Sequence, residues 1–223
     1  APLAGIYTVA QMGGVLLRKL GKAGAKAMLL TYQDHSIRES YLVDGQPLFS
    51  RMVPLFDSSI AGIASRLAAE STKLHQYLAG QRLIRRSEPM PVFVLAHPQA
   101  VATVRQACVD TSSLRFEIVD SHQAARRLDL KTLPSDSSSE LIFLHLLATT
   151  PPRQQFAAEP HRHDYRISQL RYGLIALGIV ALLGGALFAA RQLYGAYSLH
   201  QEAETLTANE ADLSWRYREI SAT

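Results

Sequence analysis

Cysteine is almost absent from this sequence. The one cysteine, Cys108, excludes an internal disulfide framework and any metal site built from several thiolates. It lies in the apolar stretch Val101–Val109, so we interpret it as a small buried hydrophobic residue rather than a nucleophile. Charged residues are also few, at 19% of the chain, and the net charge is +4. The excess Lys and Arg residues are scattered and form no basic stripe interleaved with aromatics, which argues against nucleic acid as a partner.

Motifs of the common nucleotide-binding and hydrolytic sites are missing as well. Gly21–Lys22 is no phosphate loop, because Leu16 stands where that motif needs glycine and Ala23 stands where it needs Ser or Thr. No Gly-x-Ser-x-Gly elbow occurs. His161–His163 lacks a third ligand cluster, so a basic linker is favoured over a metal site. We therefore expect no enzyme, no cofactor and no metal.

Histidines follow two of the expected strands, at a place where α/β proteins often have sites. His97 and His122 are interpreted as loop histidines with hydrogen-bond partners rather than as ligands. Asp110 and Asp120 are interpreted as solvated caps. We expect Ser121 to cap the helix that begins there.

One long hydrophobic run stands in the C-terminal part of the chain. Between Arg171 and Arg191 lie nineteen residues without a charge, YGLIALGIVALLGGALFAA. As a helix this run spans roughly 28 Å, close to the hydrocarbon thickness of a bilayer. Tyr172 and Tyr194 lie where interfacial aromatic residues anchor a span. We predict one transmembrane helix at 172–190.

The charges on the two sides of this run differ. Only Arg191 follows it closely, and acidic residues come next; basic residues precede it, namely Arg153, His161, Arg162, His163, Arg166 and Arg171. The positive-inside rule then places residues 1–150 in the cytoplasm and the C-terminus in the periplasm, across a bacterial inner membrane. The start at Ala1, without a signal-type apolar run, agrees with this orientation.

The sequence pattern before the span predicts an α/β domain with a mixed sheet. Asp44–Gly45 is a strong type I′ hairpin signal between runs typical of strands, which predicts an antiparallel meander. A long helix and then alternating strands and helices follow. We expect strands at 27–32, 37–43, 47–53, 92–96 and 115–119, and helices at 6–20, 59–83, 99–109, 121–128 and 140–148.

Two further segments flank the span. Residues 151–171, rich in Pro, Arg, His and Gln, are predicted as a juxtamembrane linker on anionic lipid. In residues 191–223 apolar side chains recur every seven positions, which favours a coiled-coil or helical arm. Gly185 in the span forms small-xxx-small pairs that let helices approach. We predict a homo- or heterodimer formed through these segments, with Leu199, Leu206, Leu213 and Ile220 on the shared face of the arm.

The stretch Leu29–Leu55, LLTYQDHSIRESYLVDGQPLFSRMVPL, resembles the hairpin that opens the second lobe of the actin-like assembly proteins of type IV pili and type II secretion, the PilM and GspL types. Those proteins carry a strand–DG–strand unit ending in "lFsR.vp", matched here by Leu48–Arg51 and Val53–Pro54. A long helix with an early Glu and a later Tyr follows, similar to Glu70 and Tyr77.

This resemblance implies a partial actin-like lobe in the order cytoplasmic domain, single span and periplasmic segment. The family's phosphate loop has a glycine at the first turn of the lobe, where the backbone closes on phosphate. The turn Tyr32–Ser36 has no glycine, so nucleotide binding does not carry over. We expect that a first lobe either lies upstream of Ala1 or has been lost.

Two hypotheses of function follow, and a third is less favoured. The first is a non-catalytic platform subunit of a pilus or secretion machine, which docks other machinery proteins on the hairpin around Val43–Val53. Phe49 and Arg51 would flank that docking site as an apolar anchor and a charge; the alternative is that Phe49 packs in the core and Arg51 pairs with a carboxylate. The second hypothesis is a membrane-anchored signalling or regulatory protein, and the third is an anchored hydrolase.

Overall fold

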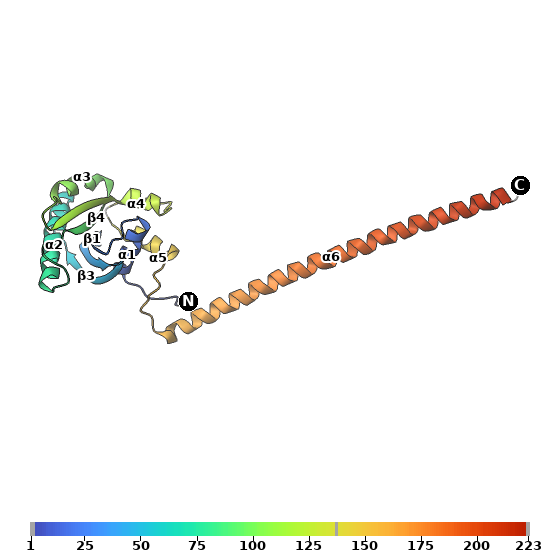
Figure 1. The fold of residues 1–223 in the computed structure, drawn as a ribbon, viewed down its shortest axis with the longest axis horizontal. Helices are drawn as coiled ribbons and strands as arrows, with labels where there is room; N and C mark the ends of the chain where they lie inside the picture. Colours follow the sequence, from blue (N-terminus) through green and yellow to red (C-terminus); the bar gives the residue numbers. More distant parts are fainter. Residues whose placement is uncertain (1–2, 137, 222–223) are drawn as a thin grey trace. The chain divides into compact units, whose positions relative to one another are not determined.

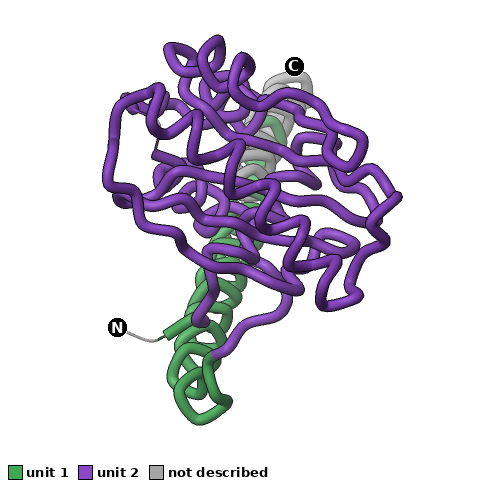
Figure 2. Tube along the Cα trace, turned by 90° about the vertical axis from the view of Figure 1, so that its left-hand side faces the viewer, with its two compact units in different colours: residues 1–4, 157–223 green, residues 5–156 purple. Residues whose placement is uncertain are grey.

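The computed structural model describes residues 3–136 and 138–221, and beyond residue 195 the side chains that it describes are Ala203, Thr207, Asn209 and Glu210. The chain divides into two compact units (Figure 2). One is Gly5–Phe156, and the other combines Ala1–Ala4 with Ala157–Thr223. Each unit is described by itself.

A five-stranded mixed sheet forms the centre of the first unit, in the order β3-β2-β1-β4-β5. The first three strands form the antiparallel meander expected from the sequence, and β1 pairs with β4 and β4 with β5 in parallel. The predicted fold class is thus confirmed. The strands are β1 (Lys26–Gln33), β2 (Ser36–Val43), β3 (Gln46–Pro54), β4 (Met90–Ala96) and β5 (Leu114–Asp120).

Helices cover both faces of this sheet (Figure 1). Helices α2 and α3 contribute to one hydrophobic core, and α1, α4 and α5 contribute to the other. The helices of this unit are α1 (Val9–Lys19), α2 (Ile60–Gly80), α3 (Pro98–Ala107), α4 (Ser121–Arg127) and α5 (Glu140–Thr149).

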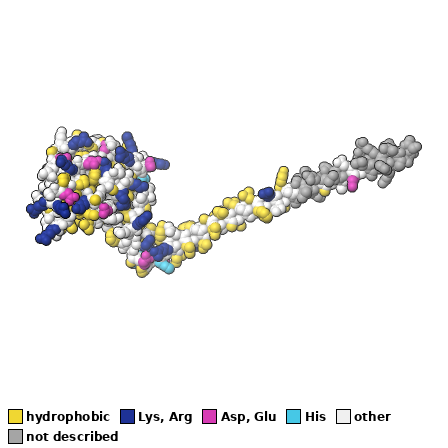
Figure 3. All heavy atoms as spheres, viewed as in Figure 1, with side chains coloured by type: hydrophobic (Ala, Val, Ile, Leu, Met, Phe, Trp, Pro, Cys, Tyr) yellow, Lys and Arg dark blue, Asp and Glu magenta, His cyan; other side chains and the backbone are white. Residues whose placement is uncertain are grey.

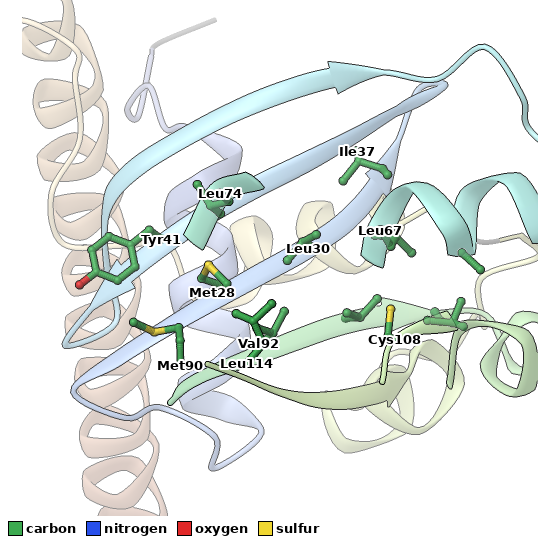
Figure 4. Packing of buried hydrophobic residues seen from close by; sticks show 14 of the residues in the cluster. Met28, Leu30, Ile37, Tyr41, Leu67, Leu74, Met90, Val92, Cys108 and Leu114 are labelled. Carbon is green, nitrogen blue, oxygen red and sulfur yellow. The ribbon is translucent and has the colours of Figure 1, made fainter. Parts of the chain in front are cut away.

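Successive side chains of a strand alternate between the two faces of the sheet, so one strand contributes to both hydrophobic cores. Met28 and Leu30 of β1 face α2, whereas Leu29 faces α1 and α5, because successive side chains of a strand point to opposite faces. Figure 4 shows the α2 side, where Leu67 and Leu74 of the helix point toward the strands. Both cores lie within the first unit, so the sheet is buried on both faces.

Both turns of the meander use the left-handed backbone region. Asp34 and His35 have φ values of 41° and 53°, and Asp44 and Gly45 have 50° and 72°, which is the pattern of a type I′ turn. The second turn lies against α1, where Arg18 donates a hydrogen bond to the carbonyl oxygen of Gly45 at 3.2 Å.

The helix starts differ in detail from the sequence analysis. Asp120, not Ser121, caps α4: its carboxylate accepts the backbone N–H groups of His122 and Gln123. The first N–H groups of a helix have no partner within the helix, and the Asp120 carboxylate accepts them. Ser121 is already the first helical residue and so is not at the cap position. Before α5, Ser138 Oγ accepts the N–H of Glu140 at 3.3 Å, and Ser139 makes no side-chain cap.

The second unit contains one helix, α6 (Glu159–Ser221). It includes the predicted span, and its part Glu159–Gly195 is long and apolar enough to cross a membrane by length and composition. Figure 3 shows hydrophobic side chains exposed along it. The segment 151–171, expected as a linker, is helical from Glu159 onward. Pro160 is compatible with this start because the first turn of a helix needs no N–H bond there.

Candidate partner-docking surface

Strand β3 is an edge of the sheet, because β2 is its only neighbour in the described sheet order. Edge strands present unpaired backbone N–H and C=O groups that can pair with another chain. Two large apolar side chains of β3 are exposed, Leu48 at 59% and Met52 at 45%. The edge therefore combines open backbone groups with apolar surface.

A bulge in the β2–β3 pairing decides which face each β3 side chain occupies. Val43 pairs with Gln46 and Leu42 with Pro47, but Tyr41 then pairs with Phe49, so Leu48 is the extra residue. One extra residue moves every later side chain to the opposite face. Phe49 therefore lies on the α2 side of the sheet, where Tyr41 belongs to the core.

Phe49 contacts the long helix. Its ring lies 5.1 Å from the ring of Tyr77 on α2, with a tilt of 39°. This separation is in the favourable range for aromatic pairs. Phe49 also packs against the core formed with α2, and it is half-buried. The side chain that the sequence analysis assigned to docking thus fixes β3 to α2.

Arg51 joins two buried carboxylates. Its Nε donates to Glu39 Oε2 at 2.7 Å, and its Nη2 donates to Glu70 Oε2 at 3.2 Å. Glu70 also accepts from Arg66 at 3.2 Å and from Lys73 at 2.8 Å. The side chains of Glu39 and Glu70 are 0% and 3% exposed, whereas Arg51 keeps 37%. We call these five residues the Arg51 cluster.

The two carboxyl groups of the Arg51 cluster have shifted pKa values in opposite directions. Burial raises the pKa of Glu39, although Arg51 opposes this. Burial also acts to raise the pKa of Glu70, but the hydrogen bond from Lys73 and the charge of Arg66 outweigh it, so that pKa is lowered. The Oε1 atom of Glu39 is buried without a partner among the described atoms. Burial of this oxygen disfavours the charged form of the Glu39 carboxyl, in line with its raised pKa.

His97 and His122, which come just after strands β4 and β5, lie next to each other but form no set of metal ligands with other described residues. The rings of His97 and His122 lie 4.8 Å apart, edge to face. His97 Nδ1 accepts the N–H of Gln99 at 3.4 Å, and His122 Nε2 lies 2.8 Å from the carbonyl oxygen of Pro134. Ser121 Oγ is buried without a partner among the described atoms. Within residues 3–136 and the described side chains that follow, no group of three or more His, Cys, Asp or Glu could hold a metal ion.

The residues predicted to associate helices are only partly described. Gly185 is exposed on α6, and a Cβ added there meets no atom. The side chains of Leu199, Leu206, Leu213 and Ile220 lie outside the described part, although their backbone is helical. Association through the span and the arm stays a prediction.

Two residues next to this edge, Glu39 and Arg38, were not identified from the sequence. Glu39 lies between Ile37 and Tyr41 on an apolar face of β2, and this acidic interruption of an apolar stripe was the available signal. Arg38 lies on the opposite face. The burial of Arg38 depends on how α1 and α5 pack against the sheet, and a local sequence pattern does not predict this packing.

Comparisons with known proteins give a distant structural likeness. No protein-family model matches the chain, and no curated protein matches it. Among solved structures, a chain described as a PilM-PilN type IV pilus biogenesis complex is similar, with a TM-score of 0.39 and 14% identity. The likeness covers 65% of this chain and 51% of that one, so this chain spans about half the length of that neighbour.

Proposed function

We propose that this chain is a non-catalytic platform subunit of a type IV pilus or type II secretion-like machine in the bacterial inner membrane. Its α/β unit lies in the cytoplasm, α6 crosses the membrane, and the end of α6 reaches the periplasm. The proposal rests on one observation: the residues that carry the family resemblance converge. Phe49 contacts Tyr77, and Arg51 contacts Glu70, so the long helix supports the edge strand β3 of the hairpin.

The docking surface of this platform is the open edge of β3. Phe49 and Arg51 support docking by holding the strand against α2, while Leu48 and Met52 offer apolar contact on its exposed side. A partner strand that pairs with β3 gains backbone hydrogen bonds from the edge and specificity from alternate side chains. Partners are other proteins of the machine, and the span and arm add association through Gly185 and the heptad residues.

Deletion of the gene is the direct test. We expect loss of surface fibres or of export of a secreted protein, with unchanged growth and metabolism, and recovery when the intact gene is returned. A double variant, Leu48→Lys with Met52→Lys, should fail to restore assembly because charge on the edge opposes strand pairing. Val109→Lys is the matched control, since Val109 is 64% exposed and lies outside β3.

The outcome also separates the alternatives. A deletion strain that assembles fibres and secretes normally but loses one enzymatic activity contradicts the platform role and supports an anchored hydrolase. Normal assembly with altered gene expression supports the membrane-anchored signalling or regulatory protein instead.

A further inference from the structure

A groove opens on the face of the sheet opposite the Arg51 cluster. It has a volume of about 400 Å³ and lies between α1, α5 and the ends of β1, β2 and β3. Its walls are mainly apolar, contributed by Tyr7, Met12, Met52, Phe143, Leu144 and Leu147. Leu144 is 63% exposed, so the groove is open to solvent along α5.

One cationic side chain lines this groove. Arg38 is half-buried, and its Nε donates to Gln33 Oε1 at 2.7 Å. Gln33 Nε2 in turn donates to Ser139 Oγ at 3.1 Å, and both of these residues are buried. Buried hydrogen bonds from β1 and the start of α5 thus hold the guanidinium in place.

Arg38 has no anionic partner among the described residues. Its second contact is a hydrogen bond of 3.5 Å to Ser50 Oγ, and no described carboxylate lies within ion-pair distance, although Asp34 and Glu140 also line the groove. Burial lowers the pKa of Arg38. A partly desolvated guanidinium without a carboxylate gains most from an anionic group brought by another molecule.

The groove adjoins the edge of the sheet. Met52 belongs to β3 and also lines the groove, so an extended peptide paired with β3 would place alternate side chains over the groove. An edge strand offers alternating N–H and C=O groups, which an extended peptide pairs along its whole length and a lipid acyl chain does not. This continuity favours a peptide as the occupant.

We propose that this groove binds an extended partner segment in which an Asp or Glu side chain pairs with Arg38 and flanking apolar side chains fill the space beside Leu144 and Met52. The inference rests on the docking role proposed above and names the chemistry of the partner: an acidic residue within an apolar strand. Asp34 and Glu140 at the groove disfavour a second acidic residue in that segment.

The test is a selection of random octapeptides displayed on phage, with the detergent-solubilised full chain as bait. We expect peptides enriched on the native protein to carry one Asp or Glu between apolar residues, and an Arg38→Met bait to lose this enrichment. For the best peptide, replacing its acidic residue by the matching amide should weaken binding to the native protein about tenfold. That comparison needs no variant protein. Leu144→Ser should weaken binding, and Val109→Ser should leave it unchanged.

Three outcomes overturn the proposal: no enrichment of acidic residues, equal enrichment on native and Arg38→Met baits, or equal affinity for the acid and amide peptides. Dodecanoate serves as a probe for anionic lipid. If dodecanoate binds in an Arg38-dependent way and no peptide does, the occupant is a lipid and the peptide proposal is wrong. A failed selection combined with loss of fibres in the deletion strain rejects the groove and leaves the platform role intact.

Discussion

At the scale of single residues, Glu39 and Glu70 share Arg51 but differ in how folding shifts their pKa values. The raised pKa of Glu39 means that its contribution to stability is present below the unfolded pKa, about 4.3, and is lost as the pH rises through the folded pKa. The lowered pKa of Glu70 has the opposite sign: its contribution is present above the unfolded pKa and is lost as the pH falls.

Glu39→Gln should therefore stabilise the α/β unit at pH 8 and change it little at pH 4, because an amide keeps the hydrogen bonds without a buried charge. Denaturant unfolding of residues 5–156 at both pH values measures this. Glu70→Gln is the matched control and should destabilise at pH 8, since it removes the charge that faces Arg51, Arg66 and Lys73. Equal destabilisation of Glu39→Gln at both pH values contradicts the raised pKa of Glu39.

Cys108 gives a second residue-scale prediction. It is 5% exposed within the α2-side core, and burial raises its pKa to about 11. At pH 8 the folded thiol is therefore almost entirely protonated, and alkylation by iodoacetamide should be slower than in the unfolded chain by on the order of 100-fold. Comparable rates with and without denaturant would contradict this burial.

At the scale of elements, α1 and the β2–β3 turn approach so closely that glycine is needed on both sides. A Cβ added to Gly14 would overlap the carbonyl oxygen of Gly45, and Gly45 itself has positive φ. Gly14→Ala should destabilise the unit by about 1–3 kcal/mol, because the helix or the turn must move. Thermal unfolding measures this.

Gly80→Ala is the matched control for this contact. Gly80 is the last residue of α2, and an added Cβ meets nothing within 4 Å. This variant should be stabilised by up to about 1 kcal/mol, through the lower entropy of the unfolded chain. A Gly14→Ala protein as stable as Gly80→Ala would show that α1 and the turn are farther apart.

The arm gives another prediction at this scale. If Leu199, Leu206, Leu213 and Ile220 share a helix face, the arm pairs with another helix, and burying each Leu contributes roughly 1.5–3 kcal/mol. Leu206→Asp together with Leu213→Asp should strongly weaken pairing, measured by analytical ultracentrifugation of the detergent-solubilised chain. A native arm that stays monomeric at high concentration, with identical behaviour of the double variant, rejects the coiled coil.

At the scale of the whole molecule, the arginines before the span predict its orientation, with residues 1–150 in the cytoplasm. Alkaline phosphatase, which is active only outside the cytoplasm, should be active when fused after Ala222 and inactive when fused after Thr149. Activity confined to the Thr149 fusion would reverse the orientation and place the β3 edge and the Arg38 groove in the periplasm. The two fusions serve as controls for each other.

The sequence by itself determined the α/β class, the meander and the apolar helix, because each depends on local information. Asp44–Gly45 favours a left-handed turn wherever it stands, and alternation assigns Met28 and Leu29 to opposite faces. Element ends follow no repeated pattern: at Asp120 the cap depends on hydrogen bonds from the backbone N–H groups of His122 and Gln123.

Only the tertiary structure decided which residues meet at the candidate site. A two-residue turn without a bulge would place Arg51 opposite Arg38 and Phe49 opposite Ser40. The extra residue Leu48 instead brings Arg51 opposite Glu39 and turns Phe49 toward α2. In this register Phe49 packs against the α2-side core and Arg51 bonds to Glu39 and Glu70, so contacts between residues far apart in the chain favour it. No local pattern in the sequence reports it.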